Sequence, residues 1–247
     1  MDKRTVIVTG GSRGIGAAIS KRFAKEGYNI VINYINNDER ANNIKSEIEN
    51  NYDSKVLLVK ADVSKEEEVK MLIDKTIETF GTINCLVNNA GIAIDKPFLE
   101  KTKKDFLNVL ETNLIGPFLT CKYAYNHLIN SQNPSIINIS SNFGINTVYP
   151  ESMDYDASKS GLISLTKSLA KVFSPEVRVN SVAPGWVKTE MNSDLDKDFM
   201  KDEEDKILLG RFAEPEEIAN VVYFLSSKEA SYINGEIIIV DGGSNGN

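Results

Sequence analysis

Short runs of β-branched and other apolar residues alternate along the chain with longer stretches whose apolar residues recur every three to four positions. The short runs predict buried strands at about 4–9, 29–34, 55–60, 83–88, 135–140, 177–182 and 236–240. The longer stretches predict amphipathic helices. Because helices separate the strands, the connections should be right-handed crossovers. The pattern predicts an α/β fold, a doubly wound, seven-stranded and mostly parallel sheet with helices on both faces.

The alternation runs without a Pro/Gly/Ser-rich linker, an internal repeat or a low-complexity tract. We therefore expect a single domain over 1–247. The least regular stretch is 184–205, which contains an acidic run punctuated by lysines. Two interpretations stay open for it, a mobile flap over a pocket and a solvated loop with a short helix.

Composition and charge exclude several classes of function. With 247 residues, 41% of them hydrophobic, the chain has ample material for a core, and its net charge of -7 argues against nucleic acid or an anionic membrane as partner. Two cysteines suggest neither a disulfide framework nor a cysteine metal site, and a single histidine disfavours a histidine metal site or a Ser-His-Asp hydrolase. No signal peptide or bilayer-spanning run is evident, so we expect a cytoplasmic protein.

A glycine-rich loop follows the first predicted strand. Residues 9–16 read TGGSRGIG, and a helical pattern begins directly after them. Glycines let the backbone turn sharply and approach a pyrophosphate, and a helix N-terminus offers unpaired amides. The glycines at 10, 14 and 16 depart from the usual G-x-G-x-x-G spacing. The position between strand and helix nevertheless favours a Rossmann-type dinucleotide site over an ordinary turn.

The charge near the adenosine ribose distinguishes the two nicotinamide cofactors. An NAD site usually has an acid about 20 residues after the glycine loop, whereas an NADP site has a cation. The second strand ends at Asn33 and Tyr34 with no acid, although Asp38 and Glu39 follow shortly. Arg13 stands in the glycine loop, where its guanidinium could pair with a 2′-phosphate. These residues favour NADP(H) over NAD(H).

Tyr155 and Lys159 are four residues apart, which places them one turn apart on a single helix face. A phenol titrates near ~10, and a cation within about 4–6 Å lowers that pKa. The pair is therefore a candidate proton donor. On spacing alone, an ordinary Tyr and Lys on a surface helix is the favoured interpretation, and the other motifs have to change that balance.

Five motifs in order resemble the short-chain dehydrogenase/reductase family from Thr5 to about Gly243: the glycine loop, residues 88–91 (NNAG), Asn113 within ETNL, the Tyr-x-x-x-Lys pair and the Pro184-Gly185 turn. The resemblance implies a catalytic set of Asn113, Ser141, Tyr155 and Lys159. Ser141 is preferred to Ser140 because Gly144 follows it by three residues, as in the family.

These residue types suit the reduction of a carbonyl group. Tyr155 would donate the proton, and Ser141 would hold the same oxygen. Lys159 would lower the pKa of the phenol and bind the nicotinamide ribose, and Asn113 would place a water for proton resupply.

Position and resemblance together imply cofactor contacts at Gly10, Ser12, Arg13, Gly14, Ile15, Gly16, Asn33, Tyr34, Asp62, Val63, Asn89, Ala90, Gly91, Tyr155, Lys159, Pro184, Gly185, Val187 and Thr189. Asp62 could instead be a helix N-cap, and Asn88 could satisfy a buried backbone group. A substrate pocket is expected near Phe143, Tyr149, Met153, Trp186 and Met191, although such residues also serve as packing.

The substrate is less sharply defined by sequence. Segments 210–219 and 233–243 resemble the 3-oxoacyl-[acyl-carrier-protein] reductase branch of fatty acid biosynthesis, which implies an acyl-thioester substrate and an acyl carrier protein as partner. The arginines with which such relatives dock the acidic carrier are replaced by residues 130–133 (NSQN) and 173–176 (FSPE). Reduction of a free steroid, sugar or xenobiotic ketone therefore stays open, as does a non-catalytic NADP-binding sensor.

The resemblance also implies a quaternary structure. It predicts a homotetramer built on helices around 112–130 and 154–172 together with the C-terminal segment.

Overall fold

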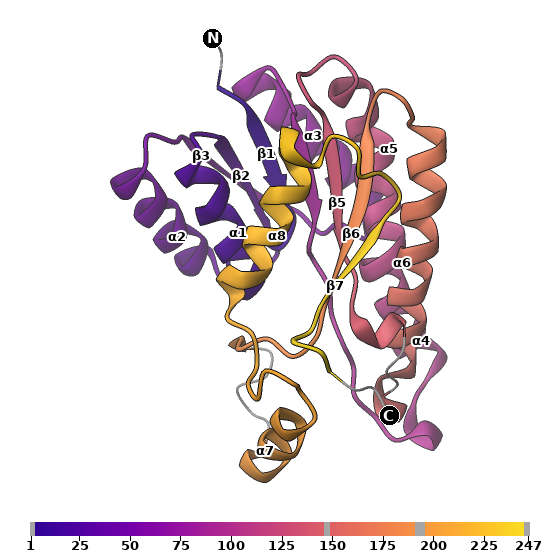
Figure 1. Cartoon of the computed structure of the whole chain (residues 1–247). Coiled ribbons are helices and arrows are strands. Elements are labelled where there is room, and N and C mark those ends of the chain that lie inside the picture. Colours follow the sequence, from indigo (N-terminus) through magenta and orange to yellow (C-terminus); the bar gives the residue numbers. More distant parts are fainter. Residues whose placement is uncertain (1–2, 146–148, 191–195, 245–247) are drawn as a thin grey trace.

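In the computed structural model, which describes residues 3–145, 149–190 and 196–244, seven strands form one parallel sheet (Figure 1). The strand order is β3-β2-β1-β4-β5-β6-β7, and every neighbouring pair is parallel. The strands are β1 (Thr5–Val8), β2 (Asn29–Tyr34), β3 (Val56–Lys60), β4 (Cys85–Asn88), β5 (Ser135–Ile139), β6 (Arg178–Pro184) and β7 (Ile237–Val240). The predicted α/β class and all predicted strands are confirmed.

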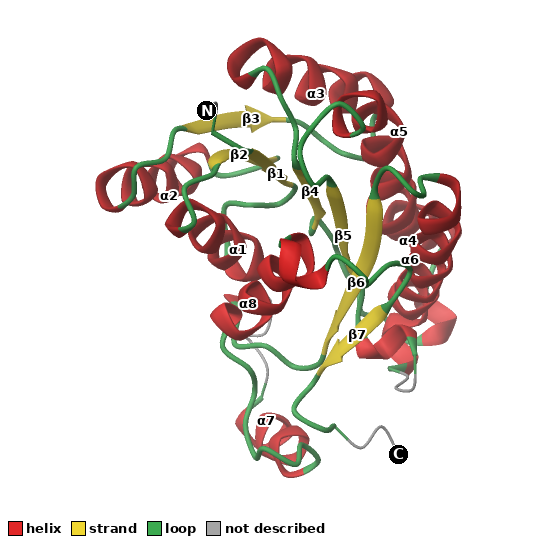
Figure 2. Cartoon of the chain, turned by 45° about the horizontal axis from the view of Figure 1, so that its top comes forward, coloured by secondary structure: helices red, strands yellow, loops and turns green. Residues whose placement is uncertain are grey.

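Helices cover both faces of the sheet (Figure 2). One apolar cluster joins the sheet to three helices through residues such as Phe23, Ile48 and Val222, and a second joins its other face through Leu72, Leu128 and Leu169. The first face carries α1 (Gly14–Lys25), α2 (Asp38–Asn51) and α8 (Pro215–Ser226), and the second carries α3 (Glu66–Phe80), α5 (Gly116–Leu128) and α6 (Met153–Val172).

The sheet has a switch point between β1 and β4. From β1 the chain builds outward through β2 and β3, then returns to place β4 on the other side of β1. Ligands of open parallel sheets bind in the crevice at the carboxyl ends of the strands, where the strand order reverses. The switch point therefore positions the site described below.

A long helical segment flanks this crevice. It consists of α4 (Lys103–Leu110), a π-helical turn η2 (Glu111–Ile115) and α5, which follow one another without interruption. Short 3₁₀ turns occur at η1 (Phe98–Glu100), η3 (Asn142–Gly144), η4 (Pro150–Ser152) and η6 (Lys228–Ala230).

The stretch expected to be a flap or a loop with a short helix contains α7 (Lys197–Asp205), which lies apart from the sheet (Figure 1). None of its residues is buried, and its attachment includes a hydrogen bond from Trp186 Nε1 to Glu203 Oε2 at 2.8 Å. Residues 191–195 lie outside the described residues. Within the described part of the chain, no helix is long and apolar enough to cross a membrane.

Candidate active site

A cavity of about 610 Å³ opens at the carboxyl ends of the central strands. Every residue predicted from sequence to contact the cofactor, apart from Asp62, is among the described residues that line it. The glycine loop forms one end, Ser141, Tyr155 and Lys159 line the other, and residues 184–187, 189 and 190 close one side. The fold thus brings together segments that are up to about 180 residues apart in the chain, in agreement with the expected position of a dinucleotide site.

The glycine loop is held by close backbone contacts. Gly10 has a φ of +62°, and a Cβ on Gly16 would lie 2.2 Å from the Gly10 carbonyl oxygen and 2.6 Å from Asn89 Nδ2. Asn89 Nδ2 itself donates to the carbonyls of Thr9 and Gly10 at 2.9 and 3.2 Å. A side chain at position 16 would therefore disrupt the loop.

The N-terminus of α1 fits a pyrophosphate group. Arg13 at its N-cap has extended dihedral angles and no side-chain capping bond, and the first turn contains no acid. The first amides of the helix are thus not capped by a side chain, and the helix dipole adds a partial positive charge. Because Gly91 has no side chain, Asn113 and Lys159 can lie close to its backbone. A Cβ on Gly91 would lie 3.3 Å from Asn113 Oδ1 and 3.5 Å from Lys159 Nζ.

Asn33 is buried at the end of β2 and supports the glycine loop. Its Oδ1 accepts from Gly10 N at 3.3 Å, and its Nδ2 donates to the Ala61 carbonyl at 2.7 Å. The backbone carbonyl of Asn33 accepts from Gly11 N at 3.0 Å. Its position in the cavity wall is as predicted, and its polar atoms hold the loop in place.

Asp62 and Asn88 do not take the alternative roles considered from sequence, because Lys65 is the N-cap of α3 and the Asn88 amide bonds other side chains. Asp62 Oδ1 accepts from both the backbone N and the hydroxyl of Ser64, and Asp62 is not among the described residues that line the cavity. Asn88 donates to Asn138 Oδ1 at 2.9 Å and accepts from the Thr120 hydroxyl at 2.6 Å, in a buried network beneath the site. An adenine contact for Asp62 stays a prediction.

The two adjacent serines have different surroundings. Ser140 Oγ donates to the Val182 carbonyl at 3.1 Å and accepts from Ser181 Oγ at 2.8 Å, so it is engaged with β6. Ser141 Oγ accepts from Phe143 N at 3.2 Å and is hydrogen-bonded to Tyr155. This arrangement supports the choice of Ser141.

Lys159 lies close to Tyr155, as the spacing predicts. The prediction that the pKa of the phenol is lowered is wrong for the cofactor-free chain. Lys159 Nζ is 5.3 Å from the centre of the Tyr155 ring. Burial nevertheless raises the pKa of Tyr155 to about 12, although the hydrogen bond with Ser141 acts in the opposite direction. Desolvation of the phenolate is the largest cause of this shift.

Burial acts on Lys159 in the opposite direction. The side chain is almost completely buried and donates to the Ile139 carbonyl at 2.8 Å. Because the charged form loses its hydration, burial lowers the pKa of Lys159 to about 8. The ammonium therefore remains the main form at neutral pH.

Asn113 lies in the π-helical turn η2 and is fully buried. Its Nδ2 donates to the Ile92 carbonyl at 2.9 Å and to Ser158 Oγ at 3.0 Å, and its Oδ1 accepts from Ile92 N at 2.9 Å. Both amide hydrogens are thus used within the chain. Asn113 is not among the described residues that line the cavity, so its predicted water contact stays a prediction.

Several site residues were missed from sequence. The buried ion pair between Lys101 Nζ and Asp154 Oδ1, at 2.8 Å, lies at the start of α6 outside the cavity lining, and the same oxygen accepts from Tyr155 N at 3.0 Å. Arg40 and Glu190 also line the cavity and form an ion pair with each other. The partners in each pair are distant in sequence, and no local pattern links them.

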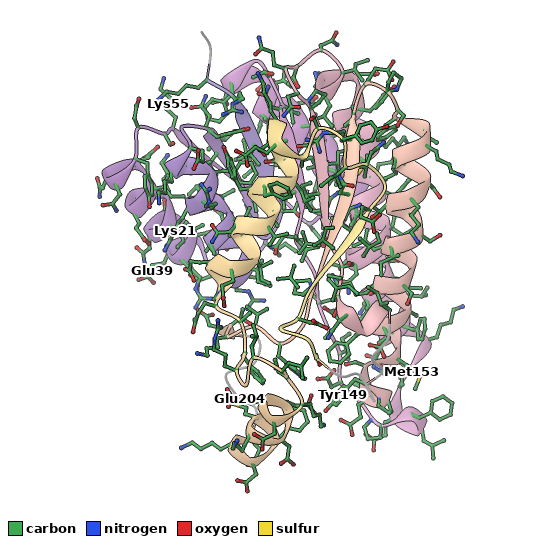
Figure 3. The ribbon with its side chains drawn as sticks, viewed as in Figure 1. Lys21, Glu39, Lys55, Tyr149, Met153 and Glu204 are labelled. Atoms are coloured by element: carbon green, nitrogen blue, oxygen red, sulfur yellow. The ribbon has the colours of Figure 1, made fainter. Side chains whose placement is uncertain are left out.

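The end of the cavity beside Tyr155 is aromatic. Phe143, Tyr149 and Trp186 line it, with the Phe143 ring 5.6 Å from Trp186 and 6.4 Å from Tyr149. Figure 3 shows Tyr149 beside the start of α6, on the side that faces α7. Phe199 of α7 packs edge-on to both Tyr149 and Trp186. Phe143, Tyr149 and Trp186 therefore line the cavity, as predicted for a substrate pocket.

The other two pocket predictions have different outcomes. Met153 faces a separate shallow groove with Phe98 and Leu107, and Met191 lies outside the described residues. Among the residues that the structure describes, no three His, Cys, Asp or Glu side chains are arranged to hold a metal ion.

Comparison with protein families gives one match over nearly the whole chain. Residues 10–245 match the family model described as enoyl-(acyl carrier protein) reductase. The chain is 41% identical to the 3-oxoacyl-[acyl-carrier-protein] reductase FabG of Aquifex aeolicus, over 96% of this chain and 95% of that protein. It is 38% identical to glucose 1-dehydrogenase 2 of Bacillus subtilis, over 97% and 94%.

Solved structures agree with this assignment. A dehydrogenase/reductase from Sinorhizobium meliloti has a TM-score of 0.93 and 37% identity, covering 99% of this chain and 96% of that one. A short-chain dehydrogenase/reductase from Serratia marcescens has a TM-score of 0.91 and 34% identity, covering 97% of each chain.

Proposed function

The chain belongs to the short-chain dehydrogenase/reductase family of nicotinamide-dependent oxidoreductases, and from this premise we propose that it is an NADPH-dependent carbonyl reductase whose substrate is a 3-oxoacyl thioester. One observation carries the catalytic part of the proposal. Ser141, Tyr155 and Lys159 line one end of a cavity whose other end is the glycine loop and the N-terminus of α1. A proton donor and a phosphate-binding loop thus share one cavity.

Burial suits Tyr155 to the role of proton donor. With a pKa raised to about 12, the phenol keeps its proton at neutral pH and can give it to the carbonyl oxygen as negative charge develops there. Ser141 would hold the same oxygen by a hydrogen bond. The bound nicotinamide would supply the hydride. After the proton leaves, the Lys159 cation would stabilise the buried phenolate, so its effect is greatest in the transition state.

We propose that Asn113 contributes to proton resupply through the backbone. Its side chain holds Ile92 and Ser158 and has no amide hydrogen left for a water. Its contacts fix the π-helical turn beside residues 89–93, and such turns often occur at functional sites.

Preference for NADPH is supported by the charges at the end of β2. Arg13 and Arg40 are the cations among the described residues lining that end of the cavity, and Asp38, the nearest acid along the chain, is paired with Lys60. A 2′-phosphate would find guanidinium partners there.

The thioester substrate is supported by the FabG relatives and by the apolar cavity end. A second candidate, a reductase of free ketones or a dehydrogenase of free alcohols, is favoured by the 38% identity with a glucose 1-dehydrogenase. It is favoured also by the net charge of -7, which would weaken steering toward an acidic carrier protein. The aromatic wall favours apolar ketones over polyhydroxylated sugars within this class.

The test is steady-state consumption of NADPH with an acetoacetyl thioester, with simple aliphatic and aromatic ketones, and of NADP⁺ with glucose. We expect the highest kcat/KM with the thioester, and Tyr155→Phe should bind NADPH normally but lose turnover by roughly 10²–10⁴-fold. Tyr123→Phe, whose hydroxyl bonds Glu66 away from the cavity, is the control.

The possible results of this experiment distinguish between the candidate functions. A preference for simple ketones or glucose would select the second candidate. Retained turnover in Tyr155→Phe would remove Tyr155 from the mechanism. Binding of NADPH without turnover on any substrate would favour a non-catalytic sensor.

We further propose a homotetramer, supported by exposed apolar side chains on two surfaces. Leu107, Ile115 and Phe118 lie along the segment from α4 to α5, and Ile239 lies on β7, the edge strand of the sheet. An unpaired edge and an exposed apolar helix face are both favourable contacts for another copy.

A further inference from the structure

The mouth of the cavity carries an ion pair that joins two distant parts of the chain. Arg40 Nη1 on α2 contacts Glu190 Oε2, which follows β6, and the two residues are separated by 150 positions. Both residues line the cavity. Arg40 is anchored through its backbone, because its amide donates to Asn37 Oδ1 at 2.9 Å in the N-cap of α2.

Arg40 stands at the adenosine end of the site. Residues 33–37, from the end of β2 to the N-cap of α2, line the same cavity, and the ribose 2′ position of a dinucleotide is bound at the end of this strand. The described cavity-lining residues include three cations, Arg13, Arg40 and Lys159, and two acids, Asp95 and Glu190. Lys159 belongs to the catalytic end, and Asp95 accepts a hydrogen bond from Ser152 there.

We propose that Arg40 binds the 2′-phosphate of NADP(H) and that Glu190 is an internal competitor for its guanidinium, so that the pair sets the discrimination between NADP(H) and NAD(H). This inference rests on the proposed preference for NADPH and adds to it a residue that weakens that preference. Arg13 has no such competitor, because it forms no ion pair with a carboxylate within the described part of the chain.

The relative strength of the two contacts supports exchange. The side chains of Arg40 and Glu190 are 35% and 55% exposed, and an ion pair with this exposure changes an equilibrium constant by no more than about five-fold. A phosphate monoester carries a charge of about -1.5 to -2 at pH 7 and accepts two parallel bonds from a guanidinium. It can therefore displace a single carboxylate, whereas a neutral ribose 2′-hydroxyl cannot.

Glu190 accordingly affects the two cofactors differently. NADP(H) must break the Arg40–Glu190 contact, and its 2′-phosphate must then lie near the negatively charged Glu190 carboxylate. NAD(H) can bind with the ion pair intact. Removing the carboxylate should strengthen NADP(H) binding alone, and removing the guanidinium should weaken NADP(H) binding alone.

The experiment measures dissociation constants of NADP⁺ and NAD⁺ for the full chain by quenching of Trp186 fluorescence. Trp186 is the only tryptophan and lines the cavity, so the signal reports binding without turnover. We expect Arg40→Ala to weaken NADP⁺ about ten-fold and NAD⁺ less than two-fold. Glu190→Gln should tighten NADP⁺ by about two- to five-fold and leave NAD⁺ unchanged.

Matched controls separate this inference from the proposed NADPH preference. Lys45→Ala removes a cation from the same helix, and Lys188→Gln removes a charge from the same segment as Glu190; neither residue lines the cavity, and neither variant should change the ratio of the two constants. Equal weakening of both cofactors by Arg40→Ala, or an unchanged NADP⁺ constant in Glu190→Gln, would overturn the competition.

The Arg13→Ala variant distinguishes a failure of the proposed role of Arg40 from a failure of the proposed NADPH preference. A selective loss of NADP⁺ affinity in Arg13→Ala without one in Arg40→Ala would leave the NADPH preference standing and refute only the role of Arg40. Equal affinity of the wild-type chain for both cofactors, with no selective effect of Arg13→Ala, would refute the preference itself.

Discussion

Tyr155 and Lys159 illustrate how burial decides the behaviour of single residues. Both side chains lose hydration, and both therefore shift toward their neutral forms, Tyr155 to a pKa of about 12 and Lys159 to a pKa of about 8. The lysine thus keeps a charge at neutral pH at some cost to stability. Such costs are common at active sites, where function requires groups that packing alone would not select.

Replacement of Lys159 should expose this cost through the pH dependence of stability. The folded-state pKa is lowered from 10.5 to about 8, so between these values the unfolded chain holds a proton that the folded chain has lost. The contribution of Lys159 to stability is thus lost as the pH falls toward about 8. We expect wild-type to gain up to about 3 kcal/mol over Lys159→Met between pH 8 and 10.5.

Urea unfolding of the cofactor-free proteins at a series of pH values measures this difference. A constant offset between the curves is expected as well, because Lys159→Met also removes the bond to the Ile139 carbonyl. Lys167→Met, an exposed position on the same helix, should follow the wild-type pH profile. Parallel curves for wild-type and Lys159→Met would contradict the depressed pKa.

Sequence reasoning at this scale succeeded where a contact is local. The four-residue spacing predicted that Lys159 lies beside Tyr155, because both side chains share one helix face. It could not predict the direction of the tyrosine pKa shift, since that depends on how completely other elements cover the phenol. For Asn113, no local pattern indicates that Ile92 and Ser158 take up its amide hydrogens.

Among the elements, the turn from β1 to α1 is the most constrained by packing. A Cβ on Gly16 would lie 2.2 Å from the backbone oxygen of Gly10, so the loop would have to move. We expect Gly16→Ala to lose about 1–3 kcal/mol of stability and to weaken NADPH at least ten-fold, because the phosphate-binding amides move with the loop. Urea unfolding and Trp186 quenching measure the two effects.

Gly27→Ala at the other end of α1 provides a control with a different cause. Gly27 has a φ of +77°, and no atom lies within 4 Å of the place that a Cβ would occupy, so alanine would be strained there but not crowded. It should lose about 1–2 kcal/mol of stability and bind NADPH normally. Normal NADPH binding by Gly16→Ala would show that the loop tolerates the displacement.

The strands were predictable because parallel strands buried on both faces are short, continuous apolar runs. β6 extends to Pro184, two residues beyond its predicted end, because Pro184 pairs with Val240 of β7. The π-helical turn η2 was not predicted. It has no distinctive local pattern, and it depends on the contacts that Asn113 makes with the loop after β4.

At the scale of the whole molecule, the unpredicted features are contacts between distant segments. Arg40 and Glu190 each resemble ordinary surface charges in sequence, and only the switch-point topology brings β2 and β6 to the same crevice edge. The same holds for Lys101 and Asp154, whose pairing depends on the loop after β4 packing against the start of α6. Periodicity identifies elements, whereas these pairs follow from the way the elements assemble.

The proposed tetramer depends on a surface that the fold leaves exposed. Leu107, Ile115 and Phe118, each 43% exposed, lie along the continuous segment from α4 to α5, while Ile239 lies on the edge strand β7. Two separate apolar surfaces can generate a dimer of dimers, since each would pair with its own copy around a different two-fold axis. Loss of one surface should then leave dimers.

Phe118→Glu tests this assembly by placing a charge on the helical surface alone. Light scattering after size exclusion should give about four times the 27.4 kDa chain mass for wild-type and about twice that mass for Phe118→Glu. Leu99→Glu alters a side chain that is 93% exposed outside both surfaces, and it should remain a tetramer. A monomeric wild-type, or a Phe118→Glu variant of unchanged mass, would show that copies do not associate through this helix, because a charge buried without a partner at an apolar interface costs several kcal/mol.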